Sequence, residues 1–417
     1  MIQEMNEINS DVLKLVLEND NKKILIPLFD YNNIYYIKNN LVGLFIYDIS
    51  SKEYFSFNFQ SSDLKLFSTE DVLNNIHPRK TFIKNSQYFY KYWNDRINDV
   101  DVSLWYNNES IIQFDILYCT ANPRDKHNSI YVPWIKFLES AFNYIIKLNS
   151  KFDLLDTTLY ERVWNSVYNI DLNGINKNGE IIHTNYSTIT KTGRPTSTFQ
   201  GVNMLALSKL DDRIHIQPRP GNCLFEFDWE SCHIRLIANL IQYSFDDVIS
   251  IHEYFAKYYL KKETISEIEY VNSKALTFKY LYGDLNEDVH EFFKEVNKFK
   301  IELFKEYKLN SYILSPITKR KISGIENATP SKVLNYLVQA YETEIGLIRI
   351  KQINEYLPSN HKLILWTYDS FLFDIQMEPN INNIIIKLKS ILEQDNMKVH
   401  IKYGLHNFSD MRILKLE

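Results

Sequence analysis

Residues 362–376 constrain the fold of this chain more than any other segment, because they predict two strands joined by a tight turn. Two apolar runs, residues 363–367 and 371–375, flank the polar tripeptide Tyr368-Asp369-Ser370. Short apolar runs on either side of a polar turn are typical of a buried β-hairpin. The pattern therefore places the carboxylate of Asp369 at the end of two buried strands.

A second apolar strand also ends at an aspartate. Residues 223–228 read Cys-Leu-Phe-Glu-Phe-Asp, and residues 234–241 have the apolar period of a helix. A single aspartate at a strand end is usually a cap or a turn residue. Two aspartates on adjacent strand ends can hold divalent cations, because Mg²⁺ prefers carboxylate oxygens. Asp228 and Asp369, 141 residues apart, are therefore a candidate pair of metal ligands.

One predicted helix carries a cation and two rings on the same face. Lys274, Phe278 and Tyr282 follow one another at intervals of four residues, and Gly283 comes next. The cation suits a triphosphate, and the rings suit a base or a sugar. The alternative is an ordinary amphipathic helix whose lysine reaches the solvent.

The remaining patterns predict an α+β protein. The 417 residues correspond to two or three domains at roughly 100–200 residues each. Residues 22–60 alternate between apolar and polar positions, as in a β-rich unit, and residues 134–148 have the period of a helix. A charged helical region follows from about residue 246 to residue 308. Strands mixed with helices are typical of the α+β class.

Charge and cysteine content restrict the partners and the compartment. The net charge of −5 means that any contact with nucleic acid requires a local basic surface. The three cysteines form no CxxC pair, which argues against a disulfide framework or a zinc site. The sequence shows neither an 18-residue apolar run nor a signal peptide. We therefore expect a protein of the bacterial or host-cell cytoplasm without a membrane partner.

Five collinear segments between residues 180 and 417 resemble the signature regions of family A (Pol I-like) DNA polymerases. The hairpin resembles the motif C sequence His-Asp-Glu, and the strand ending at Asp228 resembles the motif A sequence Asp-Tyr-Ser-Gln-Ile-Glu-Leu-Arg. Residues 311–322 resemble the strand and turn that precede the Asn/Gln helix of the family. In chain order the five segments are Thr190-Lys191-Thr192-Gly193-Arg194 followed by Asn203; Phe227-Asp228-Trp229-Glu230-Ser231-Cys232-His233-Ile234-Arg235; Ile251-His252 followed by the helix from Lys274 to Gly283; the pair Asn335 and Gln339; and Trp366-Thr367-Tyr368-Asp369-Ser370.

The resemblance implies a right-hand polymerase: a palm with an antiparallel sheet, helical fingers and a short helical thumb, behind a small N-terminal α/β domain resembling a degenerate exonuclease domain. The expected boundaries are 1–134 for the N-terminal domain, 135–180 for the thumb-like region, 181–245 for the first palm segment with motif A, 246–310 for the fingers, and 311–417 for the second palm segment with motif C.

The resemblance also implies a role for each matching residue. Asp228 and Asp369, with the backbone carbonyl of Trp229, would bind two Mg²⁺ ions, for which Mn²⁺ could substitute. Lys274 would bind the triphosphate and protonate the departing pyrophosphate. The other nucleotide contacts would be His252 at a phosphate, Phe278 near the sugar, Tyr282 near the templating base, and His233. The implied primer-template contacts are Arg194, Asn203, Asn335, Gln339, Tyr368 and Gly283.

Three positions depart from the family pattern. Tyr270 stands where the family has an arginine, so one cation for the triphosphate is missing. His233 replaces the motif A glutamate that blocks the ribose 2′-hydroxyl, which leaves sugar selectivity open. Motif C reads Tyr368-Asp369-Ser370 and lacks the third carboxylate, which two metals do not require.

The N-terminal half gives no sign of proofreading. It contains no Asp-x-Glu sequence of the kind that starts a 3′–5′ exonuclease site, and Asp30, Asp48 and Asp115 read as ordinary turn residues. Basic residues are sparse in the expected thumb and cluster instead at residues 319–321, where a solvated turn and a primer-template contact are equally good readings. The thumb candidates are Lys136, Lys147, Lys151 and Arg162.

The implied function is template-directed DNA synthesis for a phage, viral or plasmid-like genome. The partners would be primer-template DNA, deoxynucleoside triphosphates and accessory proteins such as a processivity factor, a separate exonuclease or a helicase-primase. Two alternatives stay open. The absence of the motif A glutamate and the presence of Ser370 favour a single-subunit RNA polymerase-like or ribonucleotide-tolerant enzyme. The departures from the family pattern also allow a non-catalytic polymerase relic that binds DNA.

Overall fold

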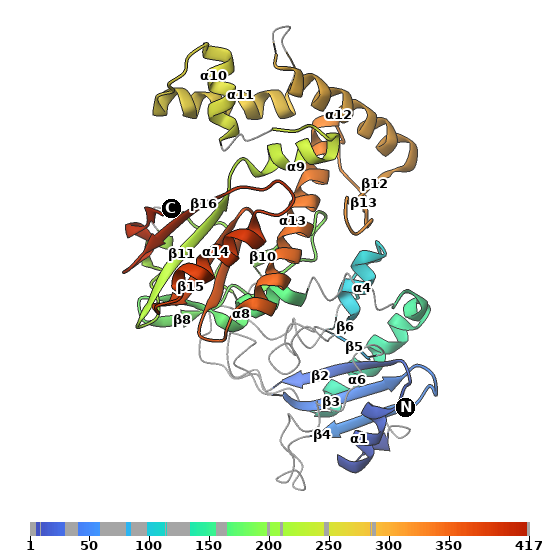
Figure 1. Ribbon diagram of the computed structural model, residues 1–417. Helices are drawn as coiled ribbons and strands as arrows, with labels where there is room; N and C mark the ends of the chain where they lie inside the picture. Colours follow the sequence, from blue (N-terminus) through green and yellow to red (C-terminus); the bar gives the residue numbers. More distant parts are fainter. Residues whose placement is uncertain are drawn as a thin grey trace. The chain divides into compact units, whose positions relative to one another are not determined.

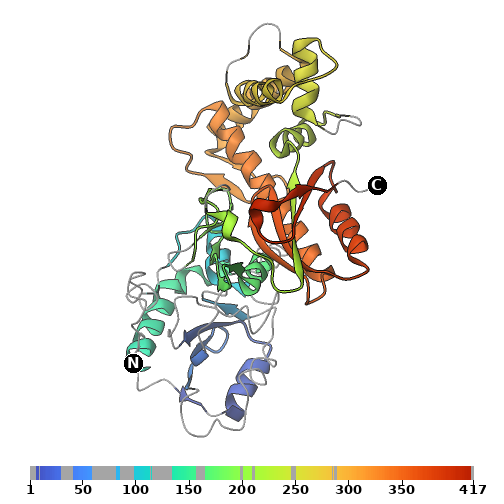
Figure 2. The same cartoon turned by 90° about the vertical axis from the view of Figure 1, so that its left-hand side faces the viewer.

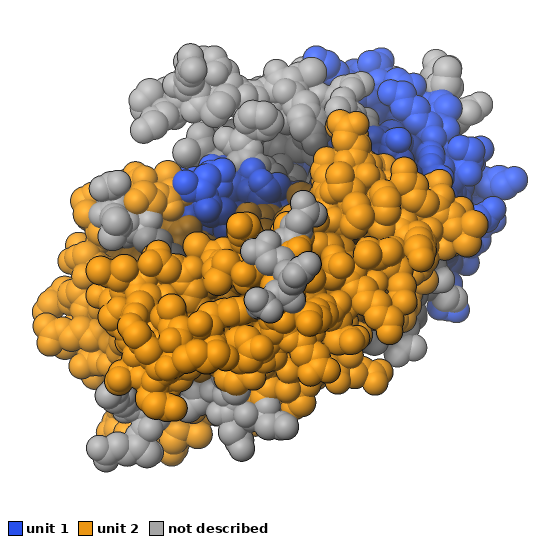
Figure 3. Space-filling model, turned by 90° about the horizontal axis from the view of Figure 1, so that it is seen from above, with its two compact units in different colours: residues 1–174, 181–189, 196–206 blue, residues 175–180, 190–195, 207–417 orange. Residues whose placement is uncertain are grey.

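The computed structural model divides the chain into two compact units, which are coloured separately in Figure 3. Unit 1 comprises residues 1–174, 181–189 and 196–206, and unit 2 comprises residues 175–180, 190–195 and 207–417. The residues that the structure describes are 6–8, 10–29, 41–58, 81–84, 98–112, 114, 134–155, 165–197, 201–208, 212–245, 250–283, 285 and 289–414.

Unit 1 is built on a six-stranded mixed sheet with the order β1-β4-β3-β2-β5-β6. The central strands β2, β3 and β4 are antiparallel neighbours, whereas β1, β5 and β6 pair in parallel. The elements are β1 (Asn6–Glu7), α1 (Ser10–Glu18), β2 (Lys23–Phe29), β3 (Leu41–Asp48), β4 (Tyr54–Asn58), β5 (Thr81–Ile83), β6 (Asn98–Asp99), α4 (Val100–Tyr106), α6 (Trp134–Leu148), η6 (Asn149–Leu154), η7 (Asn165–Val167), α8 (Tyr168–Asn173), β9 (Tyr186–Ser187) and β10 (Thr196–Ser197), with β8 (Glu180–Ile182) at the boundary of the units.

Helices cover both faces of this sheet. On one face, Leu13 and Leu17 of α1 pack against the strands in a cluster that includes Leu25. On the other face, Phe137 of α6 packs in a cluster that includes Ile24. Successive residues of β2 therefore face opposite cores, as the alternation of a strand requires. The predicted β-rich segment and the predicted helix over residues 134–148 are both present.

Two described aspartates of unit 1, Asp48 and Asp101, have structural partners. Asp48 accepts the amides of Ser50 and Ser51 at 2.9 and 3.0 Å, so it is a turn residue. The buried Asp101 pairs with Lys84, whose Nζ lies 2.6 Å from both carboxylate oxygens. Asp30, Asp115, Arg162 and Cys119 lie outside the described residues.

Unit 2 is built on a five-stranded antiparallel sheet with the order β14-β15-β11-β16-β17 (Figure 1). Its strands are β11 (Asn222–Trp229), β14 (Lys362–Thr367), β15 (Ser370–Gln376), β16 (Val399–Gly404) and β17 (Arg412–Ile413). The predicted hairpin over residues 362–376 is therefore confirmed, with Tyr368 and Asp369 as its two turn residues.

Helices α13 (Pro330–Tyr356) and α14 (Ile381–Leu392) pack on this sheet and on each other (Figure 2). Trp229 of β11 donates its indole N–H to the carbonyl of Leu392 at 2.9 Å. Gly346 of α13 lies against Trp366 of β14, since a Cβ on this glycine would come within 2.5 Å of the indole ring. Because side chains alternate along a strand, Asp228 points to the face of β11 opposite Trp229.

The other helices of unit 2 form the group drawn at the top of Figure 1. They are α9 (Cys232–Ile241), α10 (Ile251–Leu260), α11 (Glu267–Tyr282) and α12 (Glu291–Asn310). The smaller elements are β7 (Ile175–Lys177), η8 (Arg213–His215), β12 (Tyr312–Leu314), β13 (Lys321–Ser323) and η9 (Phe408–Asp410). None of the helices in the described part of the chain combines the length and the apolar character needed to cross a bilayer. The domain boundaries expected from the sequence stay predictions.

Candidate active site

The turn between β14 and β15 presents Asp369. Tyr368 occupies the left-handed region at φ 67°, which a residue with a side chain rarely adopts. Two contacts hold it there: the indole N–H of Trp366 donates to the Tyr368 carbonyl at 2.7 Å, and the Arg194 guanidinium stacks 4.3 Å from the centre of the Tyr368 ring. The neighbouring Asp369 is therefore carried by a turn whose shape is fixed from both sides.

Strand pairing brings Asp228 next to Asp369. Asp228 lies opposite Ser370 in the β11–β15 register, and the amide of Trp229 donates to the carbonyl of Asp369 at 2.8 Å. Both aspartates are partly exposed at the same end of the sheet. Their carboxylates and the Trp229 carbonyl supply the oxygen ligands that Mg²⁺ prefers. The described ranges hold no group of three or more His, Cys, Asp or Glu side chains arranged for a metal. The binding of metal ions by Asp228, Asp369 and the Trp229 carbonyl stays a prediction.

Ser370 contacts a carboxylate on the neighbouring strand. Its hydroxyl donates to Glu226 Oε1 at 3.0 Å, and Lys402 Nζ lies 3.1 Å from Glu226 Oε2. Glu226 is buried and, two residues before Asp228, points to the same face of β11. Glu226 carries no local sequence signal, because its partners Ser370 and Lys402 are 144 and 176 residues away.

Helix α11 displays the predicted cation and rings on one exposed face. A capping box of Ser266 and Glu269 starts the helix. Lys274 is exposed, Phe278 is 39 % exposed, and other apolar residues of this helix are exposed as well. Tyr282, at the end of the helix, is half-buried.

The local backbone explains why residue 283 is a glycine. A Cβ at this position would come within 2.6 Å of the Lys279 carbonyl oxygen, so no larger residue fits the end of α11. The Gly283 carbonyl accepts from Lys300 Nζ at 3.1 Å. Its expected contact with primer-template stays a prediction.

His252 lies behind the exposed face of α11. Its ring is 3 % exposed, and its ring centre lies 6.0 Å from those of Phe278 and Tyr270. Nδ1 has no hydrogen-bond partner among the described residues. Desolvation, with a smaller contribution from the charge of Lys274, lowers the pKa of His252 to about 4. At neutral pH the ring is uncharged, so it could meet a phosphate as a hydrogen-bond donor and not as a cation.

A buried ion pair links β11 to α10. Arg235 donates to the carboxylate of Glu230 at 3.0 Å, and the same carboxylate accepts the amide of Ile251 at 3.1 Å. Both charged side chains are at most 5 % exposed. The pair fixes the start of α10, and with it His252, relative to the strand that ends at Asp228.

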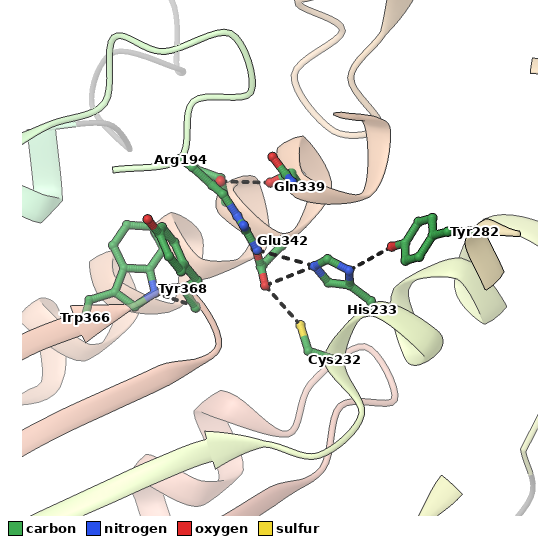
Figure 4. Close-up of polar contacts among 9 residues, drawn as sticks. Arg194, Cys232, His233, Tyr282, Gln339, Glu342, Trp366 and Tyr368 are labelled. Carbon is green, nitrogen blue, oxygen red and sulfur yellow. Dashed lines mark hydrogen bonds and ion pairs between the residues drawn. The ribbon is translucent and has the colours of Figure 1, made fainter. Parts of the chain in front are cut away.

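Glu342 of α13 is at the centre of a second buried network (Figure 4). It is 2 % exposed and pairs with Arg194, whose Nε lies 2.8 Å from Oε2. His233 Nε2 lies 3.5 Å from Glu342 Oε1, and His233 Nδ1 lies 2.9 Å from the Tyr282 hydroxyl. Burial alone would raise the pKa of Glu342, but the hydrogen bond from His233 and the charges of His233 and Arg194 outweigh it and lower that pKa. Glu342 could not be found from the sequence, because neither a motif nor a spacing marks it.

The network joins three of the predicted residues, Arg194, His233 and Tyr282, and Tyr368 stacks on its edge. Burial is the main cause that raises the pKa of Tyr282, and the negative charge of Glu342 adds to it. The Tyr282 hydroxyl therefore stays protonated at any working pH.

The basic cluster at residues 319–321 is divided between core and surface. Arg320 is buried and donates to the Lys191 carbonyl at 2.5 Å, so it fixes the loop that carries Arg194. Lys319 and Lys321 are exposed. A contact of this cluster with primer-template can therefore involve only the side chains of these two lysines.

The remaining predicted contacts lie on α13 and in unit 1. Asn335 and Gln339 are half-buried one turn apart on α13, and Gln339 is drawn beside Arg194 in Figure 4. Asn203 is exposed and belongs to unit 1. The roles of all three stay predictions.

Neither protein-family models nor curated proteins give a match to this chain. Among solved structures, the chain is similar to the polymerase domain of Pol1 from M. smegmatis, which was determined in complex with DNA primer-template and dNTP. The TM-score is 0.67 at 11% sequence identity, and the similarity covers 97% of this chain and 100% of that one. The protein therefore has the mixed α+β fold of a polymerase domain, as the sequence predicted.

Proposed function

We propose that this chain is a DNA-directed DNA polymerase that adds deoxynucleotides to a primer 3′ end. The observation that carries the proposal is the pair Asp228 and Asp369, brought to one end of the sheet by the β11–β15 register and the Trp229–Asp369 hydrogen bond. A fold similar to a polymerase domain solved with primer-template and dNTP supports it.

The two carboxylates and the Trp229 carbonyl would hold two divalent cations, Mg²⁺ or Mn²⁺. Such cations, when bound, activate the attacking hydroxyl and neutralise charge on the triphosphate. The chain's own contribution is the placement of both carboxylates on rigid strand ends. Behind Ser370, the buried Glu226 pairs with the partly exposed Lys402 and supports the same end of the sheet.

Helix α11 would bind the incoming nucleotide. The exposed ammonium of Lys274 would pair with the triphosphate and supply a proton to the leaving pyrophosphate. The exposed Phe278 ring would pack on the nucleotide, and Tyr282 would lie next to the templating base. His252 would add only an uncharged N–H, so Lys274 supplies the charge from this face.

We propose that the primer-template is held by Arg194, Asn335, Gln339 and Tyr368, with Asn203 and Gly283 as further contacts. Proofreading is not expected from this chain, because residues 1–150 contain no Asp-x-Glu sequence of the kind that starts an exonuclease site. A separate exonuclease, a processivity factor or a helicase-primase would complete replication of a phage, viral or plasmid-like genome.

Primer extension tests the proposal. Wild type, Asp228→Asn and Asp369→Asn are offered a 5′-labelled primer on a longer template with Mg²⁺ and dNTPs, and DNA binding is followed by fluorescence anisotropy. We expect extension by the wild type, loss of extension in both variants, and DNA binding by all three. DNA binding without extension by the wild type would favour the polymerase relic and overturn the proposal.

A ribonucleotide-tolerant polymerase is the second candidate. The observation that favours it is His233, which provides an imidazole and not a carboxylate between β11 and α11. Replacing dNTPs by rNTPs in the same assay separates the two, since faster extension with rNTPs would assign the chain to RNA synthesis.

A further inference from the structure

Glu342 is a buried carboxylate that receives contacts from two other segments. Arg194 comes from the loop of residues 190–195, and Cys232 and His233 come from the start of α9. A buried carboxylate costs free energy unless it is paired and hydrogen-bonded. Glu342 meets that condition only in this arrangement, so its presence fixes the relative positions of Arg194 and His233.

The His233 ring has a partner at each nitrogen. Nδ1 lies 2.9 Å from the hydroxyl of Tyr282, while Nε2 lies 3.5 Å from Glu342 Oε1 and 3.4 Å from an Arg194 nitrogen. Either tautomer satisfies both sides, because the tyrosine hydroxyl can donate or accept. Held in this way, the ring has no nitrogen left to offer a ligand, and it cannot turn without breaking a contact.

His233 contacts the helix that the proposed function assigns to the nucleotide. It is five residues beyond Asp228 and touches Tyr282, the last residue of α11, on which Lys274 lies two turns earlier. The proposed function puts the triphosphate between Lys274 and the two aspartates. The sugar would then lie toward the Tyr282 end of the helix, next to the His233 ring.

We propose that Glu342 is the positioning residue that makes this site select deoxyribose, and that it acts through His233. The inference rests on the proposed polymerase function. A 2′-hydroxyl packed against a ring with both nitrogens occupied finds only C–H groups, and a buried hydroxyl without a partner is costly. Without the Glu342 charge the ring can turn and offer Nε2 to that hydroxyl, so ribonucleotides are accepted.

Glu344 provides a matched control on the same helix. It is also buried, at 3 % exposure, but its carboxylate accepts from the amides of Ile317 and Thr318. Glu344→Gln therefore removes a buried charge of α13 without touching His233. A merely structural role of Glu342 predicts the same result for both variants.

The experiment measures kcat/KM for one dNTP and for the matching rNTP on a single primed template. The ratio of the two values does not depend on how much of the enzyme is folded, so a loss of stability does not affect it. We expect Glu342→Gln to lower the ratio about tenfold, as loss of a charge-assisted contact implies, and Glu344→Gln to leave it within about twofold of wild type. If Glu342→Gln fails to fold, Glu342→Asp, which keeps the charge on a shorter side chain, is expected to give an intermediate ratio.

A double-mutant cycle shows whether Glu342 acts through His233. His233→Ala should lower the ratio at least as much as Glu342→Gln, and the double variant should give the same ratio as His233→Ala alone. An unchanged ratio in Glu342→Gln, or additive effects in the double variant, would overturn the inference. Absence of extension by the wild type with either nucleotide would instead overturn the proposed function on which it rests.

Discussion

Acidification should destabilise this protein through one histidine. His252 is buried between α10 and α11, and desolvation together with the charge of Lys274 lowers its pKa from 6.5 to about 4. The unfolded chain therefore takes up a proton near pH 6.5, whereas the native protein does so only near pH 4. Between these values the unfolded state binds more protons, so the stabilising effect of His252 is complete above pH 6.5 and decreases as the pH falls.

The size of the effect follows from the two pKa values. Lowering the pH from ~7.5 to ~5 should reduce the free energy of unfolding by about 2 kcal/mol through His252 alone. His252→Gln keeps a polar side chain of similar size that does not titrate. The loss of stability on acidification should therefore be about 2 kcal/mol smaller in this variant than in the wild type.

Urea unfolding at the two pH values, followed by circular dichroism, measures the four free energies needed. Other titrating groups are the same in both proteins and cancel in the difference. Lys274→Met is the matched control: it removes the smaller cause of the shift, so its loss of stability should lie between the other two. Equal losses in wild type and His252→Gln, or an NMR titration of His252 near pH 6.5, would refute the reasoning.

Three further predictions concern the sheet and the nucleotide helix. Gly346→Ala should lower the free energy of unfolding, measured by urea titration, by about 1–3 kcal/mol. The new Cβ would come within 2.5 Å of the Trp366 ring, which outweighs the better helix propensity of alanine. Primer extension should slow as well, since Trp366 supports the turn of Asp369. Ser370→Glu should lower the free energy of unfolding by placing a second carboxylate against the buried Glu226. Adding Glu226→Ser should restore both stability and primer extension. A double variant that is no more stable and no more active than Ser370→Glu would contradict this. Phe278→Tyr should raise incorporation of dideoxynucleotides relative to dNTPs in primer extension, because the tyrosine hydroxyl could take the place of the missing 3′-hydroxyl. An unchanged ratio would count against a position of this ring near the nucleotide sugar.

The sequence predicts best those elements whose signal is local. The hairpin over residues 362–376 and helix α6 follow directly from the apolar pattern, and the four-residue spacing of Lys274, Phe278 and Tyr282 places them on one face of α11. Each of these predictions depends on residues within a few positions of one another. The side-chain periods of strands and helices also relate residues that are only two to four positions apart.

The residues that the sequence did not reveal depend on distant partners. Glu342 pairs with Arg194, 148 residues away, and Glu226 with Lys402, 176 residues away. The burial of His252 depends on packing against α11, so its neutral state could not be read from its place in a motif. Arg320 belongs to a run of three basic residues, which predicts an exposed side chain. Its guanidinium is instead buried and donates to the Lys191 carbonyl.

His233 and Ser370 have a common feature. According to the resemblance seen in the sequence, each would stand in the place of a glutamate, and each contacts a buried glutamate from another element: Glu342 of α13 behind His233, and Glu226 of β11 behind Ser370. In both cases a carboxylate lies directly behind the position, and this carboxylate pairs with a cation: Glu342 with Arg194, and Glu226 with Lys402. Each position therefore carries a side chain without a carboxylate that contacts a buried glutamate. A buried carboxylate costs desolvation free energy unless it is paired, and Arg194 and Lys402 offset that cost here.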